Sequence, residues 1–109
     1  MTFHEISVEE LAARLDGSEP VTLIDVRQPD EYADVHVPGA TLVPLGDVAE
    51  RIDELAAKAP LVLICRSGAR SAKACEVLSA AGIDATNVVG GTLAWVALGY
   101  PTQAGDAPA

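Results

Sequence analysis

Residues 61–82 have the sequence LVLICRSGARSAKACEVLSAAG, and this stretch decides the fold. Its first four residues are all apolar, which is typical of a strand buried on both faces. The spacing after the loop predicts a helix over residues 70–81 that Gly82 can end. The apolar face of this helix would consist of Ala74, Val77, Leu78 and Ala81. The stretch therefore predicts a strand and a helix joined by a short loop that begins at Cys65.

The rest of the chain repeats this alternation of strand and helix. Short runs rich in apolar residues predict strands at residues 3–6, 21–24, 40–43 and 86–89. Helical spacing predicts helices at residues 8–15, 29–32, 47–56 and 92–98. Strands that alternate with helices favour parallel pairing and right-handed crossovers in one sheet covered on both faces. We expect an α/β fold, three-layer α/β/α, with a mainly parallel five-stranded sheet.

Several local signals support these boundaries. Ser7 and Glu10 have the spacing of a capping box that opens a helix, and Gly17 can close it. Pro29 suits the first turn of a short helix, and Gly90-Gly91 predicts a tight turn.

Length and composition favour one domain. The chain has 109 residues, half of them apolar and 21% charged, which is ordinary globular composition. We expect a single domain over residues 1–101. Residues 102–109 are rich in Ala, Gly and Pro and are predicted to form a disordered tail.

Composition also excludes several functional classes. A net charge of -9 disfavours nucleic-acid and anionic-membrane partners. No apolar run approaches the roughly 20 residues of a membrane-spanning helix, and the N-terminal region is acidic, so a cytoplasmic location is expected. The two cysteines, Cys65 and Cys75, are too few for a disulfide framework and have no zinc-ligand spacing with histidine. Reduced thiols, no metal and no cofactor are expected.

The charge around Cys65 differs from the average of the chain. No acidic residue lies between Glu54 and Glu76. Four of the seven cationic side chains fall in this interval: Lys58, Arg66, Arg70 and Lys73. Cys65 therefore lies in a locally cationic stretch of an acidic protein.

The position of Cys65 suits an anion. Ligands of open α/β sheets bind at the carboxyl ends of strands, and Cys65 lies at such an end, just before a helix. Backbone N–H groups of residues 66–70 can surround the sulfur, and the helix dipole adds positive charge on the same side. Gly68 would allow the positive φ that this ring of amides needs. These features, with Arg66 and Arg70 nearby, favour the nucleophilic thiolate.

Four segments together resemble the rhodanese family, and the resemblance covers nearly the whole chain. They are Asp25-Val26-Arg27-Gln28-Pro29-Asp30-Glu31-Tyr32, His36-Val37-Pro38-Gly39-Ala40, Cys65-Arg66-Ser67-Gly68-Ala69-Arg70-Ser71, and Gly90-Gly91 followed by Trp95. One position departs from the pattern: Val35 stands where the family usually has Gly before the His. A change in the local turn is expected there, away from the loop chemistry.

The resemblance implies a sulfurtransferase with a rhodanese-like fold. Cys65 would attack the outer sulfur of a small anionic donor such as thiosulfate, and a persulfide would remain on the protein. An acceptor would then take the sulfur: cyanide, or a thiol of a thioredoxin-like or sulfur-carrier protein. The implied substrate-binding residues are Arg66, Ser67, Gly68, Ala69, Arg70 and Ser71. The charged loop favours thiosulfate over mercaptopyruvate, which uncharged loops of the family prefer.

Other functions fit the sequence less well. Protein tyrosine phosphatases have five residues between Cys and Arg, whereas Arg70 follows Cys65 after four. Rhodanese-related phosphatases and arsenate reductases also have a loop one residue longer. A redox role for Cys65 and Cys75 lacks the Cys-x-x-Cys motif. The main alternative is a non-catalytic rhodanese-like binding or sensing module, which retention of Cys65 disfavours.

Residues outside the loop are interpreted mainly as structural. Asp25 is expected to cap a strand end and Arg27 to pair with Glu31. His36 is expected to fix a loop through a hydrogen bond, and Cys75 to join the core. Trp95 is equally compatible with a pocket wall and a packing anchor.

Overall fold

The protein forms a five-stranded sheet in which every pairing is parallel. We describe a computed structural model, which covers residues 3–105. The strand order is β1-β5-β4-β2-β3. The strands are β1 (His4–Ile6), β2 (Thr22–Asp25), β3 (Thr41–Leu42), β4 (Leu61–Ile64) and β5 (Ala85–Val88). The five-stranded parallel sheet predicted from the sequence is confirmed, and β4 occupies the predicted residues.

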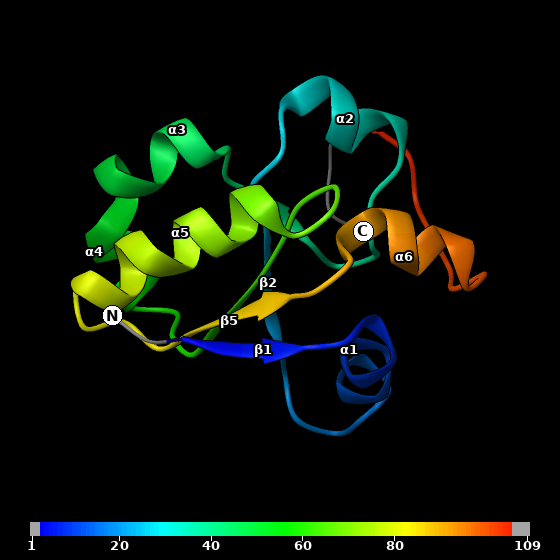
Figure 1. Cartoon of the computed structure of the whole chain (residues 1–109), viewed down its shortest axis with the longest axis horizontal. Coiled ribbons are helices and arrows are strands. Elements are labelled where there is room, and N and C mark those ends of the chain that lie inside the picture. Colours follow the sequence, from blue (N-terminus) through cyan, green and yellow to red (C-terminus); the bar gives the residue numbers. More distant parts are fainter. Residues whose placement is uncertain (1–2, 106–109) are drawn as a thin grey trace.

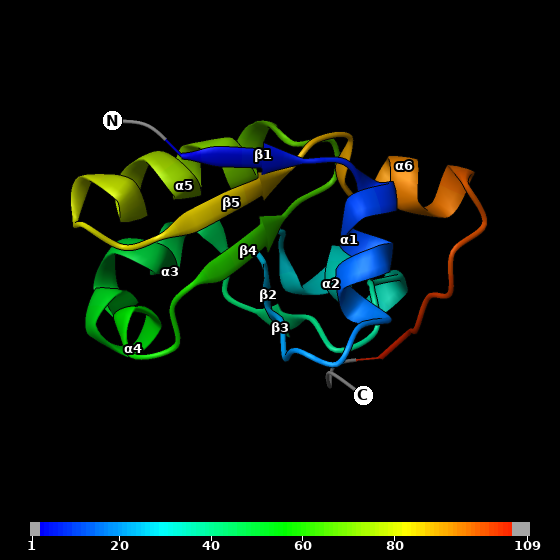
Figure 2. The same cartoon turned by 90° about the horizontal axis from the view of Figure 1, so that it is seen from below.

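Helices cover both faces of the sheet. They are α1 (Val8–Leu15), α2 (Pro29–Asp34), α3 (Leu45–Val48), the 3-10 helix η1 (Ala49–Arg51), α4 (Ile52–Ala56), α5 (Ala69–Ala80) and α6 (Gly91–Ala97). In Figure 1 the long helix α5 runs beside the sheet, with α1 and α6 grouped at the other side of the molecule. Figure 2 shows α3, α4 and α5 on one side of the strands and α1, α2 and α6 on the other. This is the expected three-layer α/β/α arrangement.

Strand β4 explains why the fold-deciding stretch begins with four apolar residues. Leu61 and Leu63 point into the cluster that also contains residues of α3, α4 and α5. Val62 and Ile64 point into the opposite cluster, with residues of α1 and α6. All four are buried, because β4 lies at the centre of a sheet covered on both faces. Each contributes roughly 1.5–3 kcal/mol through burial.

Parallel pairing brings the loops after three strands to one edge of the sheet. Asp25 at the end of β2 pairs with Ile64 at the end of β4, and Leu63 pairs with Asn87 of β5. The segments that follow these strands, beginning at Val26, Cys65 and Val89, therefore meet at the same edge.

The helix predicted over residues 47–56 is wrong as a single element. The chain forms α3, η1 and α4 there, and the helical run begins two residues earlier, at Leu45 after Pro44. The backbone of Arg51, with φ −112° and ψ 23°, leaves the helical region and interrupts the run. The predicted apolar face of the later helix is also wrong at Ala81, which is exposed and lies just beyond α5 as its C-cap residue.

Residues 103–105 of the predicted tail make backbone hydrogen bonds to the chain at residues 33–36. The N–H of His36 donates to the carbonyl of Gln103 (2.8 Å), and the N–H of Gln103 donates back (2.9 Å). The N–H of Gly105 donates to the carbonyl of Ala33 (2.8 Å). Backbone hydrogen bonds, which composition does not reveal, therefore hold this segment against the last turn of α2 and the residue His36 that follows it. Residues 106–109 of the predicted tail lie outside the described residues.

Within residues 3–105, no helix combines the length and apolar character that crossing a membrane requires.

Candidate functional site

The loop between β4 and α5 places the sulfur of Cys65 beside backbone N–H groups. Gly68 is the N-cap of α5 and has a φ of +109°, as the sequence predicted. This conformation brings the N–H of Gly68 to 3.1 Å from Sγ of Cys65. A residue with a side chain rarely adopts it, so Gly68 allows the chain to turn inward around the sulfur.

The first turn of α6 fixes the carbonyl side of the same loop. The N–H of Thr92 donates to the carbonyl of Cys65 (2.9 Å), and that of Leu93 donates to the carbonyl of Arg66 (3.0 Å). A Cβ atom on Gly91 would overlap the carbonyl oxygen of Cys65, so only glycine fits this approach. The sequence predicted a turn at Gly90-Gly91 but not this contact. These two hydrogen bonds fix the position of the loop at Cys65 and Arg66.

The surroundings of Cys65 lower the pKa of its thiol. Its residue is 1% exposed, and this burial is the largest single influence, which opposes ionisation. Hydrogen bonds from the Ser71 hydroxyl and from the N–H groups of Ser71, Gly68 and Ser67 together outweigh it, so the pKa lies below its ordinary value. The loop therefore favours a buried thiolate, the form in which cysteine is a nucleophile.

A buried polar network extends from the sulfur to strand β5. Oγ of Ser71 lies 3.3 Å from Sγ of Cys65 and 2.5 Å from Oδ1 of Asn87. The amide nitrogen of Asn87 donates to the carbonyl of Gly68 and to the carboxylate of Glu5, both at 3.3 Å. Because two acceptors hold this nitrogen, Oδ1 must face Ser71. Sequence reasoning missed Asn87, although a polar residue inside a buried strand beside the site is a usable signal.

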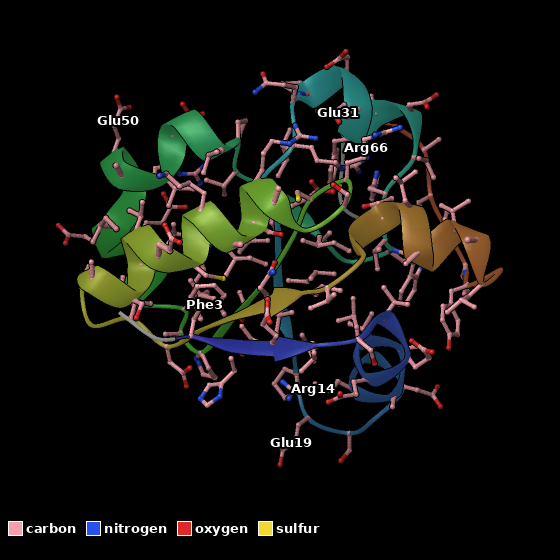
Figure 3. The ribbon with its side chains drawn as sticks, viewed as in Figure 1. Phe3, Arg14, Glu19, Glu31, Glu50 and Arg66 are labelled. Atoms are coloured by element: carbon pink, nitrogen blue, oxygen red, sulfur yellow. The ribbon has the colours of Figure 1, made fainter. Side chains whose placement is uncertain are left out.

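The two arginines of the loop have different surroundings. Arg66 is exposed and forms no ion pair with any residue in the range 3–105. Arg70 donates to Glu31 of α2 through both terminal nitrogens, at 2.7 and 2.8 Å. Figure 3 labels Glu31 and Arg66, which lie in the same part of the molecule, near α2 and the loop after β4. Glu31, which precedes Arg70 by 39 residues in the chain, thus places a carboxylate beside the cationic stretch.

Arg27 does not pair with Glu31, and that prediction is wrong. Its guanidinium binds the carboxylate of Asp25, with the shortest contact at 2.8 Å, and donates to the carbonyl of Val35 at 2.6 Å. Asp25 and Arg27 are both buried and form an ion pair with each other, so we assign them a structural role. Val35 has extended backbone (φ −160°), which any residue adopts, so the departure from glycine there needs no special turn.

Other residues considered in the sequence also have structural surroundings. His36 is buried, its ring is stacked on that of Tyr32, and its Nδ1 lies 2.8 Å from the Tyr32 carbonyl, the loop-fixing bond that was expected. Trp95 is buried in the core and donates to the carbonyl of Pro101 (2.7 Å), which identifies it as a packing anchor. Cys75 is buried in the core as predicted, and burial raises the pKa of its thiol to about 12.

The predicted site residues lie together in one loop and the start of one helix. They are Cys65, Arg66, Ser67, Gly68, Ala69, Arg70 and Ser71. Of these, Gly68 and Ser71 contact the sulfur directly, Ser67 acts through its backbone N–H, and Arg66 and Ala69 are exposed. The arrangement can hold a negatively charged sulfur and present cationic groups beside it.

Comparisons with known proteins agree with this chemistry. The family model described as a rhodanese-like domain matches residues 7–98. A sulfurtransferase of Allochromatium vinosum is 38% identical over 102 residues, which cover 93% of this chain and 95% of that protein. The thiosulfate sulfurtransferase GlpE of Pseudoalteromonas translucida is 31% identical, covering 89% of this chain and 92% of that one. A crystal structure of a rhodanese-like domain protein from Staphylococcus aureus has a TM-score of 0.80 and 38% identity, covering 85% of this chain and 91% of its own.

Proposed function

This chain belongs to the rhodanese family, and from that premise we propose that it moves a sulfane sulfur from thiosulfate, or a similar small anionic donor, to a thiophilic acceptor through a persulfide on Cys65. The observation that best supports the proposal is the sulfur of Cys65, buried yet with a lowered pKa, at 3.1 Å from the N–H of Gly68. A ring of fixed donors around one sulfur suits a persulfide anion at the same place.

The first half-reaction breaks the S–S bond of the donor. The Cys65 thiolate attacks the outer sulfur of thiosulfate, a new S–S bond forms, and sulfite leaves with the bonding electrons. One thiolate and one dianion give one persulfide anion and one sulfite dianion, so charge and atoms balance. Because the hydrogen bonds to Sγ lower the pKa of Cys65, the thiolate forms without a general base.

The loop residues divide the remaining tasks. The N–H groups of Ser67, Gly68 and Ser71 and the Ser71 hydroxyl hold the charge on sulfur. Arg66 at the surface binds the oxyanion end of the donor and the departing sulfite. Arg70 contributes the guanidinium N–H groups that do not bind Glu31, and Ala69 is the first residue of α5 beside them.

The second half-reaction returns the thiolate. A nucleophilic acceptor, either cyanide in the test tube or a protein thiol, attacks the outer sulfur of the persulfide, and Cys65 leaves as thiolate. Two successive transfers through a covalent intermediate predict ping-pong kinetics. The free thiols Cys65 and Cys75 suit a reducing compartment, and we place the activity in the cytoplasm.

Mass spectrometry and an acceptor assay test the proposal. Protein incubated with thiosulfate should gain one sulfur atom, lose it on addition of cyanide, and release thiocyanate. Cys65→Ser should neither gain sulfur nor turn over, whereas Cys75→Ser, the matched control, should do both. Turnover by Cys65→Ser would refute the nucleophile. A wild-type protein that gains no sulfur from any donor would instead be a binding module.

A further inference from the structure

Glu31 places a fixed negative charge beside the reactive loop. Its carboxylate binds Arg70 in a bidentate manner, Nη1 to Oε1 at 2.7 Å and Nη2 to Oε2 at 2.8 Å. The Arg70 hydrogen bonds are the main reason that the pKa of Glu31 falls to about 2. Both side chains are about one third exposed or less, so the pair stands at the surface. The carboxylate is therefore ionised throughout the working pH range.

The fold holds Glu31 independently of Arg70. The N–H of Gln28, the N-cap residue of α2, donates to Oε1 of Glu31 at 3.0 Å. This is half of a capping box, in which the third residue of the helix reaches back to the N-cap. The carboxylate thus belongs to the structure of α2 and remains in place whether or not a donor approaches.

The balance of charges at the loop follows from this pair. Arg70 and Glu31 together have no net charge, whereas Arg66 is exposed and forms no ion pair within residues 3–105. A donor with one negative charge matches the single uncompensated cation. A donor with two negative charges is repelled by Glu31 twice as strongly, because the Coulomb energy is proportional to charge.

We propose that Glu31 is a specificity-determining residue that lowers the preference of this site for doubly charged sulfur donors relative to singly charged ones. The proposal rests on the sulfur transfer proposed above and adds a determinant outside the loop. Arg70 then serves partly as the counter-ion of Glu31.

Two donors with the same reacting bond isolate the effect of charge. Thiosulfate is a dianion, and methanethiosulfonate is a monoanion. With the latter, the Cys65 thiolate attacks the outer sulfur, the S–S bond breaks, and methanesulfinate leaves as an anion. Two anions react and two are formed, as in the thiosulfate reaction, and cyanide removes the sulfur from the same persulfide in both cases.

Glu31→Gln removes the charge and keeps the shape. Glutamine serves as well as glutamate at the third position of a capping box, so the start of α2 is retained. We expect kcat/KM to rise roughly fourfold for thiosulfate and roughly twofold for methanethiosulfonate, because the logarithm of the change should double with the charge of the donor. Added salt should reduce both changes.

Two further variants separate charge from other effects. Glu54 forms a similar pair with Arg51 at α4, so Glu54→Gln removes the same charge away from the loop. The ratio of kcat/KM for thiosulfate to kcat/KM for methanethiosulfonate should be the same in Glu54→Gln as in the wild type. The double variant Glu31→Gln/Arg70→Gln restores a pair without net charge, and its ratio should return towards that of the wild type. An unchanged ratio in Glu31→Gln, an equal change in Glu54→Gln, or no return in the double variant would overturn the proposal.

Alkylation of Cys65 tests Glu31 without sulfur transfer. Iodoacetate is a monoanion and iodoacetamide is neutral, and both alkylate the thiolate. Glu31→Gln should raise the ratio of the two rates at Cys65 roughly twofold, as for a singly charged donor. If no donor forms a persulfide on the wild type, the proposed function is wrong while this ratio still decides the role of Glu31. A ratio equal to that of the wild type would remove that role.

Discussion

Replacing Ser71 by alanine should make Cys65 a weaker acid and a slower nucleophile. The hydroxyl of Ser71 is the largest of the influences that lower the pKa of Cys65, and burial, which raises it, would remain. A hydrogen bond to a charged group contributes roughly 1.5–3 kcal/mol. The hydroxyl is shared with Asn87, so we take the lower end of this range. That energy corresponds to roughly a tenfold loss of thiolate below the pKa.

The assay is the rate of alkylation by neutral iodoacetamide as a function of pH. At pH values below the pKa of Cys65, Ser71→Ala should react about ten times more slowly than the wild type, and it should regain the wild-type rate only at higher pH. Ser67→Ala is the matched control, because Ser67 acts on the sulfur through its backbone N–H, which the substitution keeps. An unchanged profile for Ser71→Ala, or an equal loss in Ser67→Ala, would refute this account of the thiolate.

Three further outcomes follow from the structure. The pKa of Glu31 is depressed from 4.5 to about 2, so its ion pair stabilises the fold fully above pH 4.5. This contribution is lost as the pH falls towards 2. In urea unfolding, the free energy of unfolding of Glu31→Gln should therefore fall less over that pH interval than that of the wild type. Gly91→Ala should destabilise the protein by more than Gly99→Ala in the same assay: both glycines have positive φ, but only at Gly91 does the new Cβ meet the Cys65 carbonyl, and equal losses would contradict this contact. A thiol reagent should modify Cys65 alone in the native protein and Cys75 only after denaturation, because burial raises the pKa of Cys75 to about 12.

The sequence predicts the sheet well because its information there is local. A run of four apolar residues identifies β4, and the capping residues around Ser7 identify the start of α1. The Ser7 oxygen does accept from the N–H of Glu10. Residues 45–56 were misjudged because apolar spacing alone does not reveal a single backbone departure such as that at Arg51. The segment at residues 103–105 was missed because backbone pairing with His36 leaves no mark in composition.

In the candidate site too, features that depend on local sequence were predicted and features that depend on distant segments were not. Gly68 was predicted from the loop itself, because a positive φ is a property of one residue and its neighbours. The contributions of Asn87, Gly91 and Glu31 were not predicted, since each depends on how a distant segment packs against the loop. The packing of α5 against β5 places Asn87 beside Ser71, and the approach of α2 places Glu31 beside Arg70. Such pairings follow from the assembled sheet and not from spacing along the chain.

In the function proposed above, the groups that stabilise the Cys65 thiolate differ from the charged side chains that would select the donor. The sequence suggested that Arg66 and Arg70 help to form the thiolate. In the structure, the largest favourable influences on Cys65 are hydrogen bonds from neutral groups, and the charge of Arg70 is compensated by Glu31. Neutral donors fixed by the backbone hold the sulfur anion without attracting every anion in solution. Substituting the charged side chains should therefore change the preference for a donor without removing the backbone amides that hold the sulfur.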